Sequence, residues 1–223
     1  MTDLYISADI ESDGPIPGEF SMLSFGFAVA GSFDGESFSP EPDRATFYRE
    51  LQPISERFDP DALRVSGLDR NRLATEGAPP AAAMAVAAAW VDEQASGDRR
   101  PVMVAYPAVF DWMFLHWYFV RFAGRSPFGF SGALDMKTMY QQKAGVVLDR
   151  AGRRDLPAAL VPDAPHTHNA LDDAVEQAEL LQNLMLWPGA ARRERDASDV
   201  GGAASPDLGG TASPDLSGAA SPD

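Results

Sequence analysis

The amino-acid sequence predicts an α/β fold in which a β-sheet is layered against helices. Short β-prone runs alternate along the chain with longer helical segments, which is typical of this class. A compact apolar run at residues 101–105 (PVMVA) comes shortly before an almost uniformly apolar segment at residues 109–122. These two segments predict a buried strand followed by a buried helix.

The other predicted elements follow from local patterns. Two β-prone runs separated by a Gly/Pro-rich connection indicate a hairpin-like start, and a third run combines Thr with aromatic residues. Asp59 and Pro60 predict the start of a short helix that ends near Gly67, and Pro188 ends the last helix. Strands are expected at residues 4–10, 22–31, 45–51 and 101–105, and helices at residues 59–67, 80–93, 109–122 and 169–187.

Composition limits the function classes. The chain has 223 residues, of which 45% are hydrophobic, as expected for one globular domain with a tail. The absence of cysteine excludes a disulfide framework, a thiolate zinc site and a cysteine nucleophile. No secretory signal pattern and no apolar stretch of about 18 to 20 residues is present, so no membrane contact and a cytoplasmic location are expected.

The C-terminal segment has a different composition from the rest of the chain. Residues 191–223 are expected to form a disordered acidic tail rich in Gly, Ala, Ser and Pro, after a single domain at residues 1–190. The pattern ASPD recurs at residues 204–207, 212–215 and 220–223. Such a segment offers too little apolar surface to offset the entropy of ordering. An acidic peptide that docks on a partner is the alternative.

Two acids lie on the first predicted strand. Asp9 and Glu11 are two residues apart, so their side chains project from the same face of the strand. Burying both acids beside apolar neighbours is costly unless a divalent cation neutralises them. The alternative is a pair of solvated acids on an exposed edge strand.

Further polar residues stand at the starts of two predicted helices. Asp111 opens the apolar helix, where it either joins a site or stabilises the helix terminus by about 0.3–1 kcal/mol. His168 precedes the last helix and Asp173 lies in its early turns. Five helical residues turn the chain by about 500°, so His168 belongs on the connecting loop if both side chains serve one site. The alternative is helix capping, with Asp172 in solvent.

Three short motifs together resemble the exonuclease motifs of the DEDDh family. They are DIESDG at residues 9–14, VFD at residues 109–111 and HNALDDA at residues 168–174. The family includes the proofreading exonuclease subunit of bacterial DNA polymerase, ribonuclease T and oligoribonuclease. The resemblance covers about residues 4–187 and includes ALRVSGL at residues 62–68, which is similar to a segment between the family's first two motifs.

The resemblance implies a ribonuclease H-like exonuclease fold, with a mixed central sheet flanked by helices. It also implies hydrolysis from the 3′ end of single-stranded DNA or RNA with release of nucleoside 5′-monophosphates. Matched position by position, the metal ligands are Asp9, Glu11, Asp111 and Asp173, and the general base is His168. Oxygen ligands without thiolate favour two Mg²⁺ or Mn²⁺ ions.

Other side chains are candidates for substrate contact. Ser12 stands where the family often has Thr, near the terminal nucleotide, and Phe20 and Phe110 are aromatic groups that can stack on bases. The basic cluster at residues 150–154 either contacts phosphates or forms a solvated loop. Packing is preferred for Tyr106. Solvent exposure is preferred for the remaining nearby acids, which are Asp13, Asp135 and Asp172. His116 is expected in the core or on a helix face. His166 is ranked below His168 because of its spacing to Asp173.

Two features weigh against the exonuclease hypothesis. Pro107 replaces the Asn that many relatives carry in the second motif. The net charge of −15, or −11 for residues 1–196, disfavours a protein that coats nucleic acid, although a loaded metal site is locally cationic. A noncatalytic nucleic-acid or polymerase-binding module is therefore the rival hypothesis. A polymerase, an RNA-processing assembly and a second copy of the chain are candidate partners, and the choice between DNA and RNA stays open.

Overall fold

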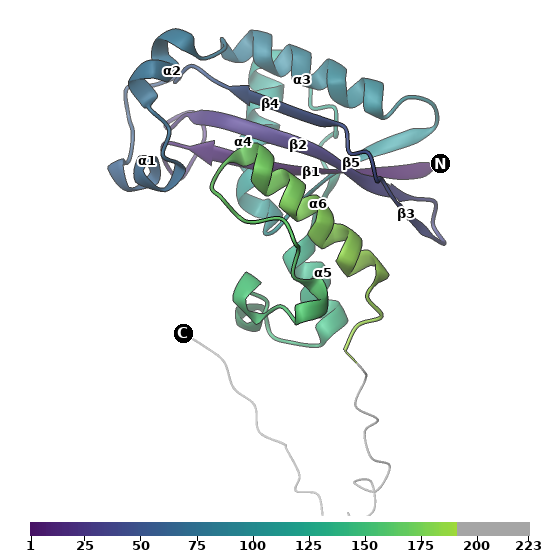
Figure 1. Cartoon of the computed structure of the whole chain (residues 1–223). Helices are drawn as coiled ribbons and strands as arrows, with labels where there is room; N and C mark the ends of the chain where they lie inside the picture. The colour runs from purple at the N-terminus through teal and green to yellow at the C-terminus, as the bar shows by residue number, and fades with distance from the viewer. Residues whose placement is uncertain (191–223) are drawn as a thin grey trace, which may run out of the picture. The chain divides into compact units, whose positions relative to one another are not determined.

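A mixed six-stranded sheet runs through residues 1–190, which are the residues that this computed structural model describes (Figure 1). Its main path is β3-β2-β1-β5-β6, and β4 also pairs with β2. β1 pairs antiparallel with β2 and parallel with β5. The strands are β1 (Thr2–Ser12), β2 (Met22–Phe33), β3 (Phe38–Pro40), β4 (Thr46–Glu50), β5 (Arg99–Ala105) and β6 (Ala133–Asp135). The predicted mixed sheet is confirmed, and the predicted tail lies outside the described residues.

Helices cover both faces of the sheet, which creates two separate cores. One core lies against α3 (Pro80–Gln94) and α4 (Ala108–Tyr118), and the other lies against α5 (Met136–Ala144) and α6 (Ala170–Leu186). β1 is central, so Ile6 faces the first core while Tyr5 faces the second. This two-sided burial explains why β1 reads as a nearly continuous apolar run until its acids. No helix in this part of the chain is long and apolar enough to cross a membrane.

Helix boundaries largely follow their end signals. In α1 (Pro60–Ser66), Asp59 caps the first turn and Gly67 ends the helix with φ 65°, as predicted. The predicted helix at residues 109–122 is instead divided, because α4 ends at Tyr118 and a π-helical turn follows at Phe119–Ala123. Four further elements have no counterpart among the predicted ones: α2 (Arg70–Glu76), α5, β3 and β6. The two strands have only three residues each, so pairing with neighbours rather than a local pattern defines them.

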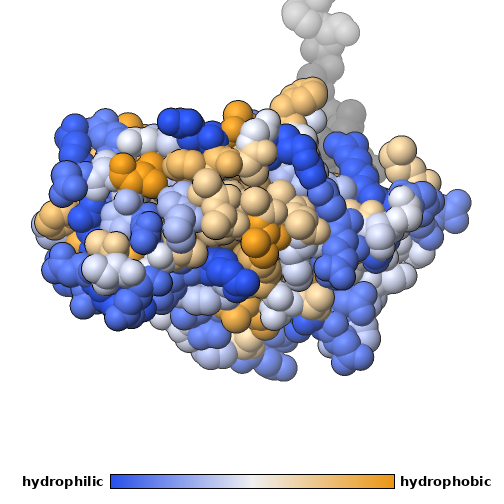
Figure 2. Space-filling model, turned by 90° about the horizontal axis from the view of Figure 1, so that it is seen from above, coloured by the Kyte–Doolittle hydropathy of each residue, from blue (hydrophilic) through white to orange (hydrophobic). Residues whose placement is uncertain are grey.

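The outer face of α3 is apolar as well as its inner face. Seen from above, apolar side chains gather where α3 lies (Figure 2). The exposed members on this helix are Ala81, Ala82, Ala85, Val86 and Ala89. α3 therefore covers the sheet with one side and exposes small apolar side chains on the other, until the acids Asp92 and Glu93 near its C-terminal end.

Gly26 sets how closely α6 approaches the sheet. It pairs with Asp9 across β1 and β2, and a Cβ atom at this position would lie 2.3 Å from the carbonyl oxygen of Ala170, the first residue of α6. A side chain would therefore displace the beginning of α6. The glycine thus permits the close contact that brings the first turns of this helix beside Asp9.

Replacement of Gly26 by alanine is expected to lower the free energy of unfolding by about 1–3 kcal/mol, because the added methyl group overpacks a backbone contact. Urea unfolding measures this effect. Gly152→Ala is the control, because a Cβ atom there would approach only the side-chain oxygen of Asp155, at 3.2 Å. Equal stability of Gly26→Ala and the original protein would contradict this account of the helix contact.

Candidate active site

Four acids converge at the C-terminal end of β1. Asp9 and Glu11 project from this strand, and Asp173 comes from the early turns of α6; one carboxylate oxygen from each lies within 4.8 Å of the others. Asp111 arrives from the first turn of α4, and its Oδ1 accepts a hydrogen bond of 3.1 Å from the backbone N–H of Ile10. The Asp111 carboxyl is thereby fixed to the strand residue between the two acids of β1. The structure thus brings together the four acids that the motifs predicted.

Burial and mutual repulsion make these acids hard to ionise. Burial raises the pKa of Asp9 well above its usual range, and the charges of Asp111, Glu11 and Asp173 raise it further. Burial likewise raises the pKa of Glu11 to about 8, with added contributions from Asp173 and Asp111. The pKa of Asp111 is raised to about 7, also by burial. A set of hard oxygen donors with this excess of negative charge suits divalent cations, whose binding would displace the protons.

The metal-free protein is expected to lose stability as the pH rises from about 4.5 to about 8. In this window the folded protein retains protons on Glu11 and Asp111 that the unfolded chain has released, so each increase in pH favours unfolding. Urea unfolding in EDTA across this window measures the slope. Glu11→Gln should flatten it, and added Mg²⁺ should offset it at the upper end. A stability that rises with pH in EDTA would contradict the expected sign.

Gln177 holds Asp9 in place and was not identified from the sequence. Its Nε2 donates a hydrogen bond of 2.8 Å to Asp9 Oδ1, and its Oε1 accepts one of 2.6 Å from the backbone N–H of Tyr106. Gln177 stands four residues after Asp173, so both side chains lie on the same face of α6. That spacing was the available signal. The amide therefore connects β1, α6 and the end of β5.

Arg153 is the cation whose charge acts on the acids. It forms an ion pair with Glu176, and its positive charge partly offsets the raised pKa of Asp9 and of Asp111. Arg150 and Arg154 are exposed, as a solvated loop predicts, whereas Arg153 is half-buried. The three arginines are therefore not equivalent.

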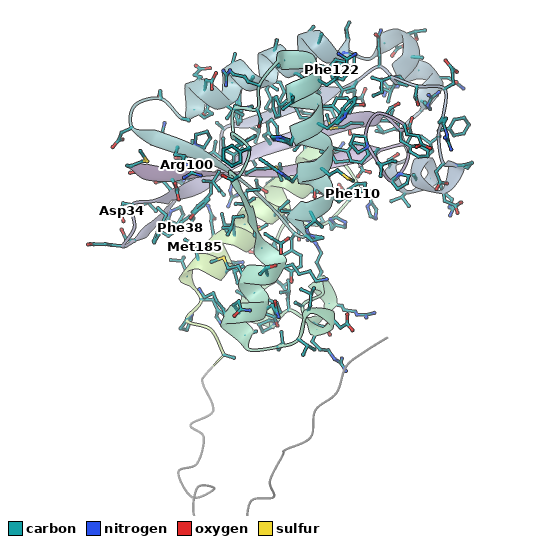
Figure 3. All side chains as sticks on the ribbon, turned by 180° about the vertical axis from the view of Figure 1, so that it is seen from behind. Asp34, Phe38, Arg100, Phe110, Phe122 and Met185 are labelled. Carbon is teal, nitrogen blue, oxygen red and sulfur yellow. The ribbon has the colours of Figure 1, made fainter. Side chains whose placement is uncertain are left out.

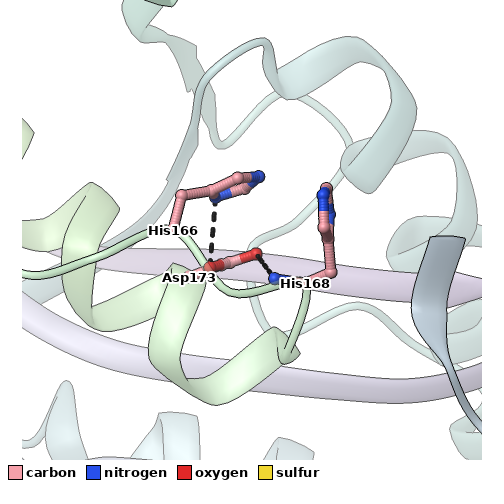
Figure 4. Close-up of side chains that lie close together, drawn as sticks. All are labelled: His166, His168 and Asp173. Carbon is pink, nitrogen blue, oxygen red and sulfur yellow. Dashed lines mark hydrogen bonds and ion pairs between the residues drawn. The ribbon is translucent and has the colours of Figure 1, made fainter.

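His168 lies on the loop before α6, as predicted, and its ring is exposed (Figure 4). The carboxylate of Asp173 holds this loop: Oδ1 accepts the N–H of Thr167 at 2.7 Å, and Oδ2 accepts the N–H of His168 at 3.0 Å. These bonds support a φ of 59° at His168, a conformation that non-glycine residues seldom adopt. The loop conformation and the position of Asp173 are therefore coupled.

His166 is closer to the site than its sequence spacing suggested. Its Nδ1 lies 3.1 Å from Asp173 Oδ1, and its ring centroid lies 4.7 Å from that of His168 (Figure 4). Spacing along the chain ranked His168 alone beside Asp173. The bend of the loop brings both imidazoles there.

The three predicted substrate-contact residues have different surroundings. Ser12 is buried and its hydroxyl donates a hydrogen bond of 2.8 Å to the carbonyl of Gly14. Phe20 is half-buried, with the guanidinium carbon of Arg57 5.6 Å from its ring centroid. Phe110 is 37% exposed at the lower end of α4 in Figure 3, next to Asp111 in the chain. Phe110 therefore has the freest ring beside the acids, and substrate contact by all three residues stays a prediction.

Two acids that were expected in solvent instead have structural roles. Asp13 is fully buried and forms a 2.9 Å ion pair with Arg70, so its predicted exposure is wrong. Asp135 caps α5, and it also accepts a hydrogen bond of 2.7 Å from the N–H of Ala108 at the start of α4. The second contact explains how α4 begins after Pro107, which has no side chain to cap it. The helix that carries Asp111 is therefore anchored without the usual Asn.

Other predictions about nearby side chains are confirmed. Tyr106 is buried, and its hydroxyl donates a 2.8 Å hydrogen bond to the carbonyl of Ala151, which is a packing role. His116 lies on the helix face with its ring stacked on Trp112 at 4.9 Å. Asp172 is exposed beside the cluster.

The mixed sheet, its flanking helices and the acids at the end of its central strand define a ribonuclease H-like exonuclease fold. No family model matches the sequence. The chain is 36% identical over 180 residues to the 3′-5′ DNA exonuclease Cap18 of Escherichia coli. The matched region covers 81% of this chain and 90% of that protein. The chain belongs to the family of DEDDh-type 3′-5′ exonucleases, whose members use divalent metal ions.

Solved structures of nucleases share the fold at low sequence identity. Cell-death related nuclease 4 matches with a TM-score of 0.59 at 15% identity, and a full-length 3′-exonuclease matches with a TM-score of 0.62 at 13% identity. Both comparisons cover 82% of this chain, which spans 63% and 62% of the respective neighbours. E. coli exonuclease I in complex with a dA16 oligonucleotide also matches, with a TM-score of 0.51 at 16% identity; it covers 82% of this chain and 40% of that one.

Proposed function

We propose that this protein removes nucleotides from the 3′ end of single-stranded DNA by a two-metal mechanism and releases nucleoside 5′-monophosphates. The convergence of Asp9, Glu11, Asp111 and Asp173 at one end of β1 is the observation that carries the proposal. DNA is chosen because the relative at 36% identity is a DNA exonuclease. RNA, which the sequence left open, becomes an arm of the test.

The four carboxylates would hold two Mg²⁺ or Mn²⁺ ions, which supply a water of lowered pKa and stabilise negative charge on the leaving 3′ oxygen. His168 accepts the proton of the attacking water through its exposed imidazole. Asp173 fixes the backbone of that histidine, and Gln177 prevents Asp9 from rotating away from the site. The protein groups thus orient the acids and move one proton.

Digestion of matched DNA and RNA strands, labelled at the 5′ end, tests the proposal. Stepwise shortening of DNA and release of deoxynucleoside 5′-monophosphates are expected with Mg²⁺ or Mn²⁺, but not in EDTA. A strand with a 3′-terminal phosphorothioate linkage is the control for direction. Cleavage inside the strand, or no cleavage of either polymer with either metal, would overturn the proposed activity. Faster digestion of RNA would overturn the choice of DNA.

The noncatalytic binding module remains the rival because Pro107 departs from the family motif. The contact between Asp135 and the start of α4 weakens that objection, since Asp111 is held without the Asn. Calorimetric titration with Mn²⁺ separates the hypotheses: the enzyme should bind two ions, and Asp9→Ala should lose this binding. Polymerase, RNA-processing and self-association partners remain predictions.

A further inference from the structure

Two histidines and one carboxylate form a second cluster beside the four acids. His166 Nδ1 lies 3.1 Å from Asp173 Oδ1, and the two imidazole rings are 4.7 Å apart and tilted by 71° (Figure 4). One ligand atom from each of His166, His168 and Asp173 lies within 4.8 Å of the other two. Both rings are exposed, so an ion can reach them from solvent. Only Asp173 belongs to both clusters.

The donor atoms of this cluster differ in kind from those of the four-acid site. Imidazole nitrogen suits Zn²⁺ and related transition metals, whereas carboxylate oxygens alone suit Mg²⁺ and Mn²⁺. Zinc sites with three protein ligands and one open position are common, with ligand distances of about 2.0–2.2 Å. A tetrahedron of that size separates neighbouring ligand atoms by about 3.3–3.6 Å. His166 and Asp173 already approach this separation, at 3.1 Å, so a modest rotation of the exposed His168 ring would complete the set.

We propose that His166, His168 and Asp173 form an inhibitory Zn²⁺ site. The inhibition rests on the function proposed above, although the zinc binding does not. Zinc at this position would occupy the nitrogen lone pair with which His168 accepts the proton, and it would compete for the carboxylate of Asp173. The site would therefore make the exonuclease sensitive to zinc while Mg²⁺ is present. His166 is the one zinc ligand of the three that has no role in the proposed reaction.

Zinc binding to the full chain is measured by calorimetry in saturating Mg²⁺. His166→Gln is expected to weaken zinc binding by at least about tenfold, because removal of even an outer partner of a metal ligand costs about 10–100-fold in affinity. Magnesium binding and activity without zinc should be retained, because the glutamine amide can still donate a hydrogen bond to Asp173 Oδ1 in place of the imidazole. The third histidine of the chain offers the control: His116→Gln should bind zinc as the original protein does, because His116 lies on α4 outside the cluster. Unfolding curves establish that both variants fold.

Cobalt provides a second measurement that does not depend on activity. Co²⁺ in place of zinc should show the absorption of a tetrahedral nitrogen and oxygen site in the original protein, and His166→Gln should lack it. Zinc binding that resists His166→Gln but is lost in Asp9→Asn would place the ion among the four acids and overturn the proposal. Lack of zinc binding by the original protein would also overturn it. If zinc binds through His166 but no exonuclease activity exists, the site stands and only the proposed function fails.

Discussion

Asp111→Asn is expected to abolish measurable exonuclease activity and, at the same time, to stabilise the metal-free protein. Loss of one group that stabilises charge at a reaction centre costs about 10²–10³-fold in kcat, and loss of a metal ligand should cost at least as much. The fold should persist, because an asparagine oxygen can still accept the N–H of Ile10. Stability should rise because the substitution removes a buried negative charge that repels Asp9 and Glu11.

The two effects are measured separately. Single-turnover digestion gives the activity, and urea unfolding in EDTA near pH 8, above the raised pKa of Asp111, gives the stability. Asp172→Asn is the matched control: this exposed aspartate lies beside Asp173 in the chain, so its replacement should leave activity and stability nearly unchanged. An active Asp111→Asn protein, or one that is less stable in EDTA than the original, would contradict the proposed role of this carboxylate.

The parts of the fold that could be predicted have signals within a few residues. The Asp59 cap, the Gly67 stop and the long amphipathic pattern of α6 each reflect backbone hydrogen bonding or helical periodicity, which the local sequence encodes. The same holds for the pair Asp9 and Glu11, since the two-residue repeat of a strand places both on one face. Asp111 and Asp173 required the family motifs, because no local rule says that the starts of two distant helices meet at β1.

The remaining features depend on contacts between distant segments. Gln177 reaches Asp9 across 168 residues of sequence, and the buried Asp13 pairs with Arg70, which lies 57 residues away in the chain. Asp135 acts on α4 from a position 27 residues later in the chain. An acid in solvent and a buried acid with a distant partner have the same local sequence, so the surroundings of Asp13 and Asp135 were not predictable. The position of His166 beside Asp173 was not predictable for a related reason, because chain spacing does not describe how a loop bends.

His168→Asn is expected to reduce kcat by about 10²–10⁴-fold, the usual contribution of a general base. Asparagine is the informative replacement because it tolerates the left-handed conformation that His168 adopts at φ 59°, while its amide cannot take up a proton. The backbone N–H that Asp173 accepts is also preserved. Binding of Mn²⁺ by the four acids and the free energy of unfolding should therefore remain close to those of the original protein.

The pH dependence of the residual activity tests whether the imidazole acts in catalysis or only supports the loop. A general base must be unprotonated, so in saturating Mg²⁺, which displaces the protons of the four acids, activity of the original protein should still rise with pH, and His168→Asn should lose that rise. A supporting role would lower activity without changing the shape of the profile. His166→Asn is the paired control, since it removes the neighbouring ring and should keep the rise. If His168→Asn keeps both its activity and its pH profile, the base must be sought in another group near Asp173.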